Sequence, residues 1–204
     1  METPMLILYH APRSRSSRFI WLLEEIAEPY DIALVGIRRA SGGGLDAANP
    51  HPDKRVPALI HDGELVSESA AIALYLADAF PAKVGPGPGE AGRGAFVTWL
   101  AYYAGVIEPT MKAKIADPSL ADPAVAAEFA GFERRLREAL DPGPYVLGER
   151  FSAADVLIAS VFHFSRELAP RGAVFDAYMA RIAARPAYQR ALDKEHGAKE
   201  HGDG

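Results

Sequence analysis

The sequence predicts an α/β domain followed by an all-α domain, and two observations support this fold class. Short apolar runs of strand length recur in the first third of the chain, whereas the hydrophobic period stays helical after residue 94. Between these regions, prolines and glycines crowd residues 81–94 and no periodic pattern survives. We therefore expect an N-terminal domain over residues 1–80, a linker over residues 81–94, and an all-helical domain over residues 95–204.

The first 35 residues have the pattern of a β-α-β unit. An apolar run over Met5–Tyr9 predicts a buried strand, and Tyr30–Val35 predicts a second one. Between them, apolar residues recur at helical spacing, namely Phe19, Leu22, Leu23, Ile26 and Ala27. Ser16 or Ser17 is the expected N-cap of this helix, and Pro29 ends it. The unit is long enough for a parallel crossover between the two strands.

A β-hairpin followed by a helix is predicted around the dipeptide Asp62-Gly63. This dipeptide stands between the strand-like runs Ala58–His61 and Glu64–Ser67, which is a strong hairpin signal. The last residue of the second run, Ser67, is a candidate N-cap for the helix that follows. Pro57 stands at the mouth of the first run, where proline fits a strand start or a turn, with a cis bond as one option.

The rest of the chain shows helical periodicity, interrupted by a stop at Asp141–Pro144. Before the stop, apolar residues at helical spacing form two faces, made by Phe96, Trp99, Leu100, Tyr103 and Ile107 and by Phe129, Phe132, Leu136 and Leu140. Beyond it, Ser152 with Asp155 three residues later resembles a capping box in which Asp replaces the usual Glu or Gln. The helix after this box is apolar on nearly all sides, which is typical of a buried central helix.

Composition and charge exclude several classes of function. The chain has 204 residues, of which 49% are hydrophobic and 24% charged, as in an ordinary soluble globular protein. Its net charge of −5 gives no whole-protein case for binding nucleic acid or an anionic membrane. No apolar run approaches the ~20 residues of a membrane span, and no basic segment precedes the short apolar run near the N-terminus. We therefore expect a cytoplasmic protein.

The chain contains no cysteine, and this absence restricts its chemistry. Disulfides, thiolate metal sites and cysteine nucleophiles are excluded, so thiol chemistry requires a thiol that arrives with the ligand. His10, His51 and His61 have no metal-ligand spacing, and His163 sits in the helix expected to be buried. We therefore expect no bound metal.

Two groups of motifs together resemble the soluble, cytosolic glutathione transferase family. One group lies in the first domain and comprises Val56-Pro57-Ala58-Leu59, Asp62-Gly63 and Ser67-Glu68-Ser69. The other opens the buried helix of the second domain and comprises Leu147-Gly148 and Phe151-Ser152 with Ala154-Asp155. The resemblance covers nearly the whole chain and implies a thioredoxin-like, glutathione-binding domain followed by an all-helical domain.

The resemblance implies a glutathione S-transferase that is cytoplasmic, homodimeric and active in detoxification. Such an enzyme activates the thiol of its co-substrate glutathione as a thiolate, which attacks small hydrophobic electrophiles. It needs no metal, and its expected partners include neither nucleic acid nor membrane. The sequence leaves two alternatives open, namely a glutathione-dependent isomerase or peroxidase on the same fold, and a non-catalytic protein that binds a peptide or partner.

The catalytic group implied by the resemblance is a hydroxyl near the start of the first helix. Lowering a thiol pKa by ~2 from its usual ~8.5 requires ~2.7 kcal/mol, and one hydrogen bond to an anion supplies ~1.5–3 kcal/mol. Ser14 lies where serine-type members place this hydroxyl, and Tyr9 lies where tyrosine-type members place theirs. A serine-type site with Ser14 is favoured, while Ser16 and Ser17 are better explained as N-cap residues.

The resemblance also assigns residues that bind glutathione. The backbone of Val56, in a turn fixed by Pro57, pairs with the cysteinyl unit, and Glu68 and Ser69 hold the γ-glutamyl ammonium and carboxylate. The loop before Val56 is longer and richer in proline than in the family, so Lys54 and Arg55 both qualify for the glycyl carboxylate. Arg55 is favoured because it is adjacent to Val56.

The wall of the electrophile pocket is expected in the second domain, and the candidates are Tyr102, Tyr103, Val106 and Met111. Aromatic residues at helical spacing also occur in protein cores, so core packing is the alternative role for each of them.

Overall fold

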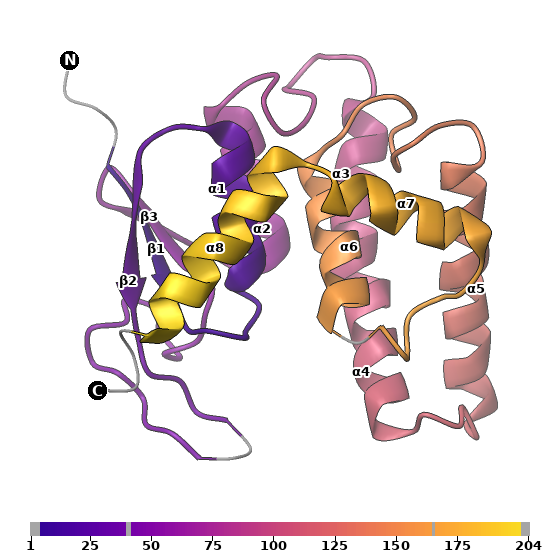
Figure 1. Cartoon of the computed structure of the whole chain (residues 1–204), viewed down its shortest axis with the longest axis horizontal. Coiled ribbons are helices and arrows are strands. Elements are labelled where there is room, and N and C mark those ends of the chain that lie inside the picture. The colour runs from indigo at the N-terminus through magenta and orange to yellow at the C-terminus, as the bar shows by residue number, and fades with distance from the viewer. Residues whose placement is uncertain (1–4, 40–41, 165, 201–204) are drawn as a thin grey trace. The chain divides into compact units, whose positions relative to one another are not determined.

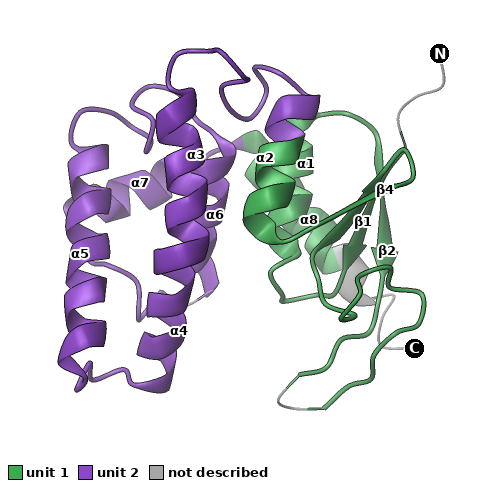
Figure 2. Ribbon diagram, turned by 180° about the vertical axis from the view of Figure 1, so that it is seen from behind, with its two compact units in different colours: residues 1–75, 186–204 green, residues 76–185 purple. Residues whose placement is uncertain are grey.

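The computed structural model describes residues 5–39, 42–164 and 166–200, with side chains described up to residue 196. The chain forms two compact units, one of residues 1–75 with 186–204 and the other of residues 76–185 (Figure 2). The first unit contains a four-stranded sheet and the second is made of helices. The predicted fold class, an α/β domain followed by a helical one, is confirmed.

The sheet of the first unit has the strand order β2-β1-β3-β4. Its strands are β1 (Leu6–His10), β2 (Tyr30–Leu34), β3 (Ala58–His61) and β4 (Glu64–Ser67). β1 and β2 are parallel and are joined through α1 (Ser17–Ile26), as the β-α-β pattern predicted. β3 pairs antiparallel with both β1 and β4, which makes the sheet mixed.

The hairpin between β3 and β4 has the predicted bounds and turn. Asp62 and Gly63 have φ values of 50° and 85°, and His61 lies opposite Glu64. Two consecutive residues with positive φ are the requirement of a type I′ turn, which matches the right-handed twist of the flanking strands. The chain then enters α2 (Ser69–Ala79), within which the two compact units divide.

The final helix, α8 (Pro186–Glu200), belongs to the first unit and packs against α1 (Figure 1). The carboxylate of Glu24 on α1 accepts hydrogen bonds from Arg190 Nε at 2.7 Å and from Tyr30 OH at 2.8 Å, and Lys194 Nζ lies 2.6 Å away. Burial raises the pKa of Glu24, but these three contacts outweigh burial and lower it. A half-buried ion-pair cluster therefore ties α8 to α1, although sequence alone placed residues 186–204 in the helical domain.

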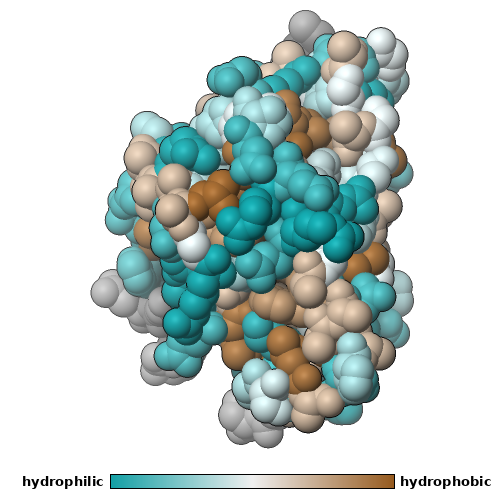
Figure 3. Space-filling model, turned by 90° about the vertical axis from the view of Figure 1, so that its right-hand side faces the viewer, coloured by the Kyte–Doolittle hydropathy of each residue, from teal (hydrophilic) through white to brown (hydrophobic). Residues whose placement is uncertain are grey.

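The second unit contains α3 (Arg93–Tyr102), α4 (Glu108–Ala116), α5 (Pro123–Leu140), α6 (Ala153–Phe164) and α7 (Ala173–Ala183). A π-helical segment, η1 (Tyr103–Ile107), joins α3 to α4. α6 is buried almost throughout, as its apolar pattern predicted. α5 buries one apolar stripe and keeps its charged residues on the outside. Hydrophilic side chains dominate the middle of the face seen in Figure 3, and hydrophobic ones gather toward its lower part.

Asp155 closes the start of α6 and is completely buried. Its carboxylate accepts hydrogen bonds from the backbone N–H groups of Ser152 at 2.9 Å and Val146 at 3.0 Å, and from Tyr178 OH at 3.1 Å. The contact from Asp155 back to the Ser152 N–H is one half of the predicted capping box. Burial is the largest influence on Asp155 and raises its pKa to about 6, against the lowering effect of these hydrogen bonds.

The segment predicted as a linker is partly built into the second unit. Residues 84–87 are buried, and the Val84 carbonyl accepts the N–H of Ala153 at 2.7 Å. Arg150 donates to the Gly85 carbonyl at 2.8 Å. A Cβ at Gly85 would lie 2.8 Å from the Phe96 ring, so a glycine is required there by close packing. The crowding of proline and glycine therefore reflects a packed turn in this segment.

Within the described residues, no helix is both long and apolar enough to cross a membrane.

Candidate active site

Three of the predicted binding segments share one end of the sheet in the first unit. β1 runs antiparallel to β3, so Tyr9 near the end of β1 lies opposite Ala58 at the start of β3. β3 runs antiparallel to β4, so Ser67 at the end of β4 also lies opposite Ala58. The loop after β1, the residues before β3 and the start of α2 therefore lie at the same end of the sheet.

Ser14 lies in the loop between β1 and α1, and its hydroxyl begins a chain of polar contacts. Ser14 Oγ is 2.7 Å from Ser16 Oγ, which is 2.8 Å from Nδ1 of His10. Ser16 Oγ also accepts the N–H of Ala11 at 3.2 Å. His10 and Ser16 are completely buried, whereas Ser14 is half-buried. Ser16 occupies the N-cap position of α1, as predicted, but its hydroxyl makes no capping hydrogen bond because it is engaged with these groups.

Glu195 on α8 lies at the inner end of this chain. Its Oε2 is 3.1 Å from Nε2 of His10, and neither atom has any other partner among the described residues. Its Oε1 accepts hydrogen bonds from the backbone N–H of Arg13 at 2.8 Å and from the hydroxyl of Ser17 at 2.9 Å. Burial raises the pKa of Glu195, but the contacts with His10, Arg13 and Ser17 outweigh burial and lower the pKa to about 2. Glu195 is therefore a carboxylate at neutral pH.

The backbone of the same loop is held from a second direction by Arg39. Its guanidinium donates to the carbonyl of Pro12 at 2.6 Å and to that of Arg13 at 3.3 Å. Arg13 has a φ of 55°, in the left-handed region that non-glycine residues seldom adopt. The loop is thus fixed at two carbonyl groups by Arg39 and at one N–H group by Glu195, on either side of this unusual conformation.

Tyr9, the alternative catalytic hydroxyl, points to the other face of the sheet. Side chains alternate between the two faces of a strand, and in β1 His10 is buried whereas Tyr9 is half-buried. The contacts among Ser14, Ser16 and His10 therefore lie on the face away from the Tyr9 side chain.

The peptide bond between Val56 and Pro57 is cis. The preceding loop folds around the buried side chain of Asn49. Its amide donates to the carbonyl of Arg55 at 3.0 Å, and its oxygen accepts the N–H of His51 at 3.0 Å. These contacts position the backbone immediately before the cis bond, so the proline-rich departure from the family pattern is internally hydrogen-bonded.

Lys54 and Arg55, the two candidates for a ligand carboxylate, have different surroundings. Lys54 Nζ donates to the carbonyl of Asn49 at 2.7 Å and to that of Ala47 at 3.4 Å, so its ammonium group is hydrogen-bonded within the loop. Arg55 is exposed, and its guanidinium has no partner among the described residues. The free cation of the pair is Arg55.

Glu68 and Ser69 stand at the start of α2. Ser69 is the first residue of the helix, and the carbonyl of Glu68 accepts the first helical hydrogen bond, from Ile72 N–H at 2.9 Å. Glu68 is therefore the N-cap, and the prediction of Ser67 was wrong because Ser67 still pairs with Ala58 in the sheet. Glu68 is exposed and has a φ of 69°, which is again the left-handed region.

The residues predicted for the electrophile pocket fall into two groups. Tyr103 and Met111 are 1% and 5% exposed, and the Tyr103 hydroxyl donates to the carboxylate of Glu108. Tyr102 and Val106 are half-buried, and the Tyr102 ring centroid lies 4.0 Å from the guanidinium carbon of Arg135. Tyr103 and Met111 thus belong to the core of the second unit, which was the alternative role, while Tyr102 and Val106 present surface to solvent.

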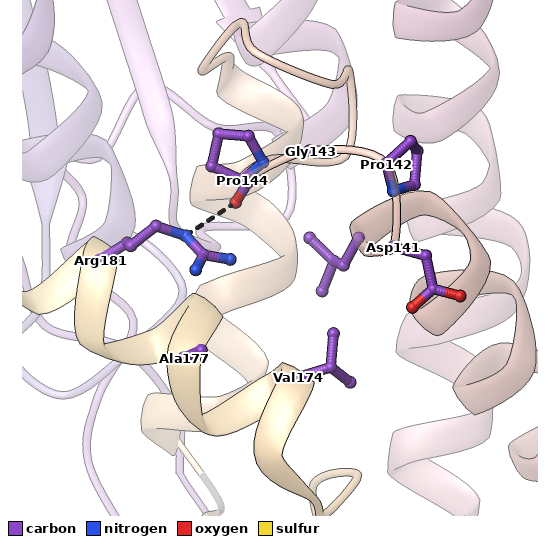
Figure 4. Close-up of a pocket in the computed structure, with 8 residues that line it drawn as sticks. Asp141, Pro142, Gly143, Pro144, Val174, Ala177 and Arg181 are labelled. Carbon is purple, nitrogen blue, oxygen red and sulfur yellow. Dashed lines mark hydrogen bonds between the residues drawn. The ribbon is translucent and has the colours of Figure 1, made fainter.

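The second unit also has a shallow hollow of about 370 Å³ between α7 and the turn over residues 141–144 (Figure 4). Val174, Ala177 and Arg181 line its α7 side, and Arg181 Nε donates to the Pro144 carbonyl at 3.2 Å. None of the predicted site residues lines this hollow. In the parts of the chain that the structure describes, no three His, Cys, Asp or Glu side chains are grouped to hold a metal.

Sequence reasoning missed three members of the site: His10, Ser16 as a network member, and Glu195. The strand alternation contained a signal for His10, because this imidazole continues the buried positions of Leu6 and Leu8 and so requires polar partners. Glu195 carried no such signal, since it lies in a polar segment 185 residues from His10 and only the return of α8 to α1 brings the two together.

Comparison with known proteins gives one family and several relatives. Residues 4–78 match the family described as the N-terminal domain of glutathione S-transferase. Glutathione S-transferase GstA of Escherichia coli O157:H7 is 29% identical over 196 residues, which cover 92% of this chain and 98% of that protein.

Solved structures extend the similarity to the whole fold. A glutathione transferase from Methylococcus capsulatus has 27% identity and a TM-score of 0.75, with 94% of this chain and 98% of that one covered. A sphingomonad glutathione S-transferase, solved in complex with glutathione, has 25% identity and a TM-score of 0.75, with 93% and 98% covered.

Proposed function

We propose that the chain is a member of the glutathione transferase family, and that its first unit binds glutathione and holds the thiol as a thiolate for attack on small hydrophobic electrophiles. The observation that carries the proposal is the position of the Ser14 hydroxyl. It lies at the end of the sheet that also presents the Val56-Pro57 pair and the start of α2. The glutathione complex of the sphingomonad relative supports the choice of ligand.

Ser14 is the proposed donor to the thiolate. One charge-assisted hydrogen bond is worth about 1.5–3 kcal/mol, which is the amount needed to ionise a thiol of ordinary pKa near neutral pH. Ser14 is half-buried and borders solvent, whereas Ser16 is completely buried and already contacts three groups. Tyr9 is the weaker candidate because its side chain leaves the sheet on the opposite face from the Ser14 network.

The rest of glutathione has proposed partners in the same unit. The backbone of Val56 pairs with the cysteinyl unit in the turn made by Pro57. Glu68 binds the γ-glutamyl ammonium, and Ser69 binds the carboxylate at the first turn of α2, where N–H groups favour anions. Arg55, the free cation of its loop, binds the glycyl carboxylate.

Tyr102 and Val106 are the proposed contacts for the electrophile, because both are half-buried in the second unit. Homodimer formation and a cytoplasmic role in detoxification are expectations from the family.

Calorimetry with glutathione, combined with ultraviolet difference absorbance of the bound thiol, tests the proposal. We expect the wild type to bind and ionise glutathione, and Ser14→Ala to bind it with the thiol ionised at least tenfold less at the same pH. Ser160→Ala is the control, because that hydroxyl donates to the Leu157 carbonyl within α6. Absence of wild-type binding at millimolar glutathione would overturn the proposed function, and undiminished ionisation in Ser14→Ala would move the catalytic role to another hydroxyl.

A further inference from the structure

A continuous row of polar atoms connects the proposed thiol site to a buried carboxylate. It runs from Ser14 Oγ to Ser16 Oγ at 2.7 Å, on to His10 Nδ1 at 2.8 Å, and from His10 Nε2 to Glu195 Oε2 at 3.1 Å. Its inner members are shielded from water, since His10 and Ser16 are completely buried. Each hydroxyl in the row has one hydrogen and two lone pairs, so the possible directions of the hydrogen bonds can be counted.

One end of the row is fixed by charge. Glu195 Oε2 faces only the imidazole, and a carboxylate accepts but does not donate. The hydrogen between these two atoms therefore belongs to Nε2 of His10. This leaves Nδ1 with two states, either an acceptor in the neutral ring or a donor in the imidazolium.

With a neutral ring, every hydrogen in the row points inward. The Ser16 hydroxyl donates to Nδ1 of His10, and its lone pairs accept the Ala11 N–H and the hydroxyl of Ser14. Ser14 Oγ accepts the N–H of Ser16 at 3.2 Å, which leaves one lone pair directed to the site. In this state Ser14 can accept a hydrogen bond from a thiol but cannot donate one.

With an imidazolium, the hydrogens from Nδ1 of His10 to Ser14 point outward, while the Nε2 hydrogen still points to Glu195. Nδ1 of His10 donates to Ser16, whose hydroxyl then donates to Ser14 at 2.7 Å in preference to the Ala11 carbonyl at 3.4 Å. Both lone pairs of Ser14 Oγ are then occupied by the hydroxyl and the N–H of Ser16, so its own hydrogen is directed to the site. The same heavy-atom positions thus satisfy both states.

We propose that these contacts form a proton relay in which His10, acting through Ser16 and Ser14, receives the thiol proton of bound glutathione. The S–H bond breaks as the proton moves to Ser14 Oγ. The Ser14 proton passes to Ser16, and the Ser16 proton passes to Nδ1 of His10. A neutral thiol and a neutral imidazole become a thiolate and an imidazolium, and Ser14 ends as the donor to the thiolate.

Glu195 is a positioning residue for this relay. Its carboxylate keeps the His10 hydrogen on Nε2, so that Nδ1 is the accepting atom, and it stabilises the imidazolium that forms. Because Glu195 also binds the N–H of Arg13 and the hydroxyl of Ser17, it aligns the Ser14 loop with the imidazole. The inference rests on the proposed function, since it requires that glutathione be the thiol at Ser14.

Proton accounting tests the relay. The fraction of bound thiol that ionises is measured by ultraviolet difference absorbance, and protons released to solution are measured by calorimetry in buffers of different ionisation enthalpy. S-methylglutathione, which has no thiol proton, corrects for every other ionisation linked to binding. At the pH where half of the bound thiol is ionised, we expect the wild type to release far less than one proton per thiolate formed.

Two variants and one control separate the relay from simple packing. His10→Asn keeps a polar group near Ser16 but accepts no proton, and Glu195→Gln removes the charge. We expect both to release one proton per thiolate, with the ionised fraction reduced about tenfold. Glu24→Gln, which weakens the ion-pair cluster between α1 and α8 without removing a member of the row, is expected to behave as the wild type.

The outcomes distinguish the relay from the proposed function. A wild type that ionises glutathione and releases a full proton per thiolate would overturn the relay while leaving the transferase site intact. A wild type that fails to bind or ionise glutathione would overturn both. If circular dichroism shows that the variants fail to fold, the number of protons that the wild type releases per thiolate formed tests the relay by itself.

Discussion

The carboxylate of Glu195 accepts a hydrogen bond from the backbone N–H of Arg13 at 2.8 Å, although 182 residues separate the two in the chain. Arg13 immediately precedes Ser14, so the last helix of the chain fixes the loop that carries the proposed catalytic hydroxyl. The arrangement makes the geometry of this loop depend on how α8 is held against α1, and it allows the contribution of Glu195 to be measured through stability as well as catalysis.

We expect Glu195 to stabilise the first unit in a defined pH range. Its pKa in the folded protein is lowered to about 2 from 4.5. The folded state therefore favours the carboxylate, and the stabilisation is fully present above pH 4.5 and is lost as the pH falls toward 2. The lowered pKa corresponds to at most about 3 kcal/mol. The free energy of unfolding of wild type should exceed that of Glu195→Gln near neutral pH and converge with it in acid.

Denaturant unfolding of both proteins across this pH range measures the difference. The control is Glu138→Gln, which removes an exposed carboxylate 3.8 Å from Arg134 and is expected to change stability by less than about 0.5 kcal/mol. A constant gap between wild type and Glu195→Gln at every pH would show that the carboxylate contributes only through its shape.

Glu68→Gly should separate stability from ligand binding. A non-glycine residue in the left-handed region costs about 1–2 kcal/mol, and glycine loses about 0.5–1 kcal/mol in entropy. Glu68 has a φ of 69°, so the glycine variant should be as stable as wild type or up to about 1.5 kcal/mol more stable. The variant should nevertheless bind glutathione at least tenfold more weakly, because the partner of the ammonium group is lost.

Ala27→Gly is the matched control for Glu68→Gly. Ala27 ends α1 with a φ of 59°, a position where glycine is also favoured, but it lies outside the proposed binding residues. Thermal unfolding and calorimetry should show a similar gain in stability and unchanged affinity. If Glu68→Gly kept full affinity for glutathione, the Glu68 carboxylate would have no part in binding.

In the first unit, the elements determined by residues adjacent in the sequence were predicted most accurately. The hairpin bounds were correct because Asp62-Gly63 supplies both positive φ values locally. The N-cap of α2 was predicted one residue early, at Ser67, because serine is a favoured capping residue. In the structure Ser67 ends the hairpin strand opposite Ala58, and Glu68 is the N-cap. Local chemistry therefore determined these elements, except where pairing across the sheet competed with it.

Contacts between distant segments could not be read from the chain. α8 has a polar sequence, and its attachment to α1 depends on Glu24 meeting Arg190 and Lys194 across the fold. The sequence explained Ser16 adequately as an N-cap and therefore did not indicate its hydrogen bond with His10. The candidate hydroxyl of Ser14 was identified from the family pattern, whereas the groups behind it required the structure.

Arg55→Ala and Lys54→Ala should have opposite signatures. Arg55 is exposed and free, so its loss should weaken glutathione binding about two- to fivefold and leave stability unchanged. Lys54 binds two carbonyl groups of its own loop, so its loss should lower stability by about 1 kcal/mol. Titration with γ-glutamylcysteine, which lacks the glycyl carboxylate, provides the control, because Arg55→Ala should not affect its affinity. A loss specific to glutathione in Lys54→Ala would instead assign the carboxylate to Lys54.

Asp155 should give the second unit a pH dependence of the opposite sign to that of Glu195. Its pKa is raised to about 6 in the folded protein from 3.8, so the folded state binds the proton more tightly than the unfolded chain does. The associated stability is present below pH 3.8 and is lost as the pH rises through 6, by at most about 3 kcal/mol. Asp155→Asn removes this titration and places an amide among the hydrogen-bond donors of Ser152, Val146 and Tyr178.

The variant should therefore be less stable than wild type by about 1–3 kcal/mol near neutral pH, since at least one donor loses its acceptor. Its free energy of unfolding should also change less than that of wild type between pH 4 and pH 6, because the group that titrates near 6 is absent. Asp141→Asn, at the exposed end of α5, is the control and should retain the wild-type slope. Parallel wild-type and Asp155→Asn curves would mean that the carboxylate is ionised throughout this range and that its hydrogen bonds, rather than burial, determine its pKa.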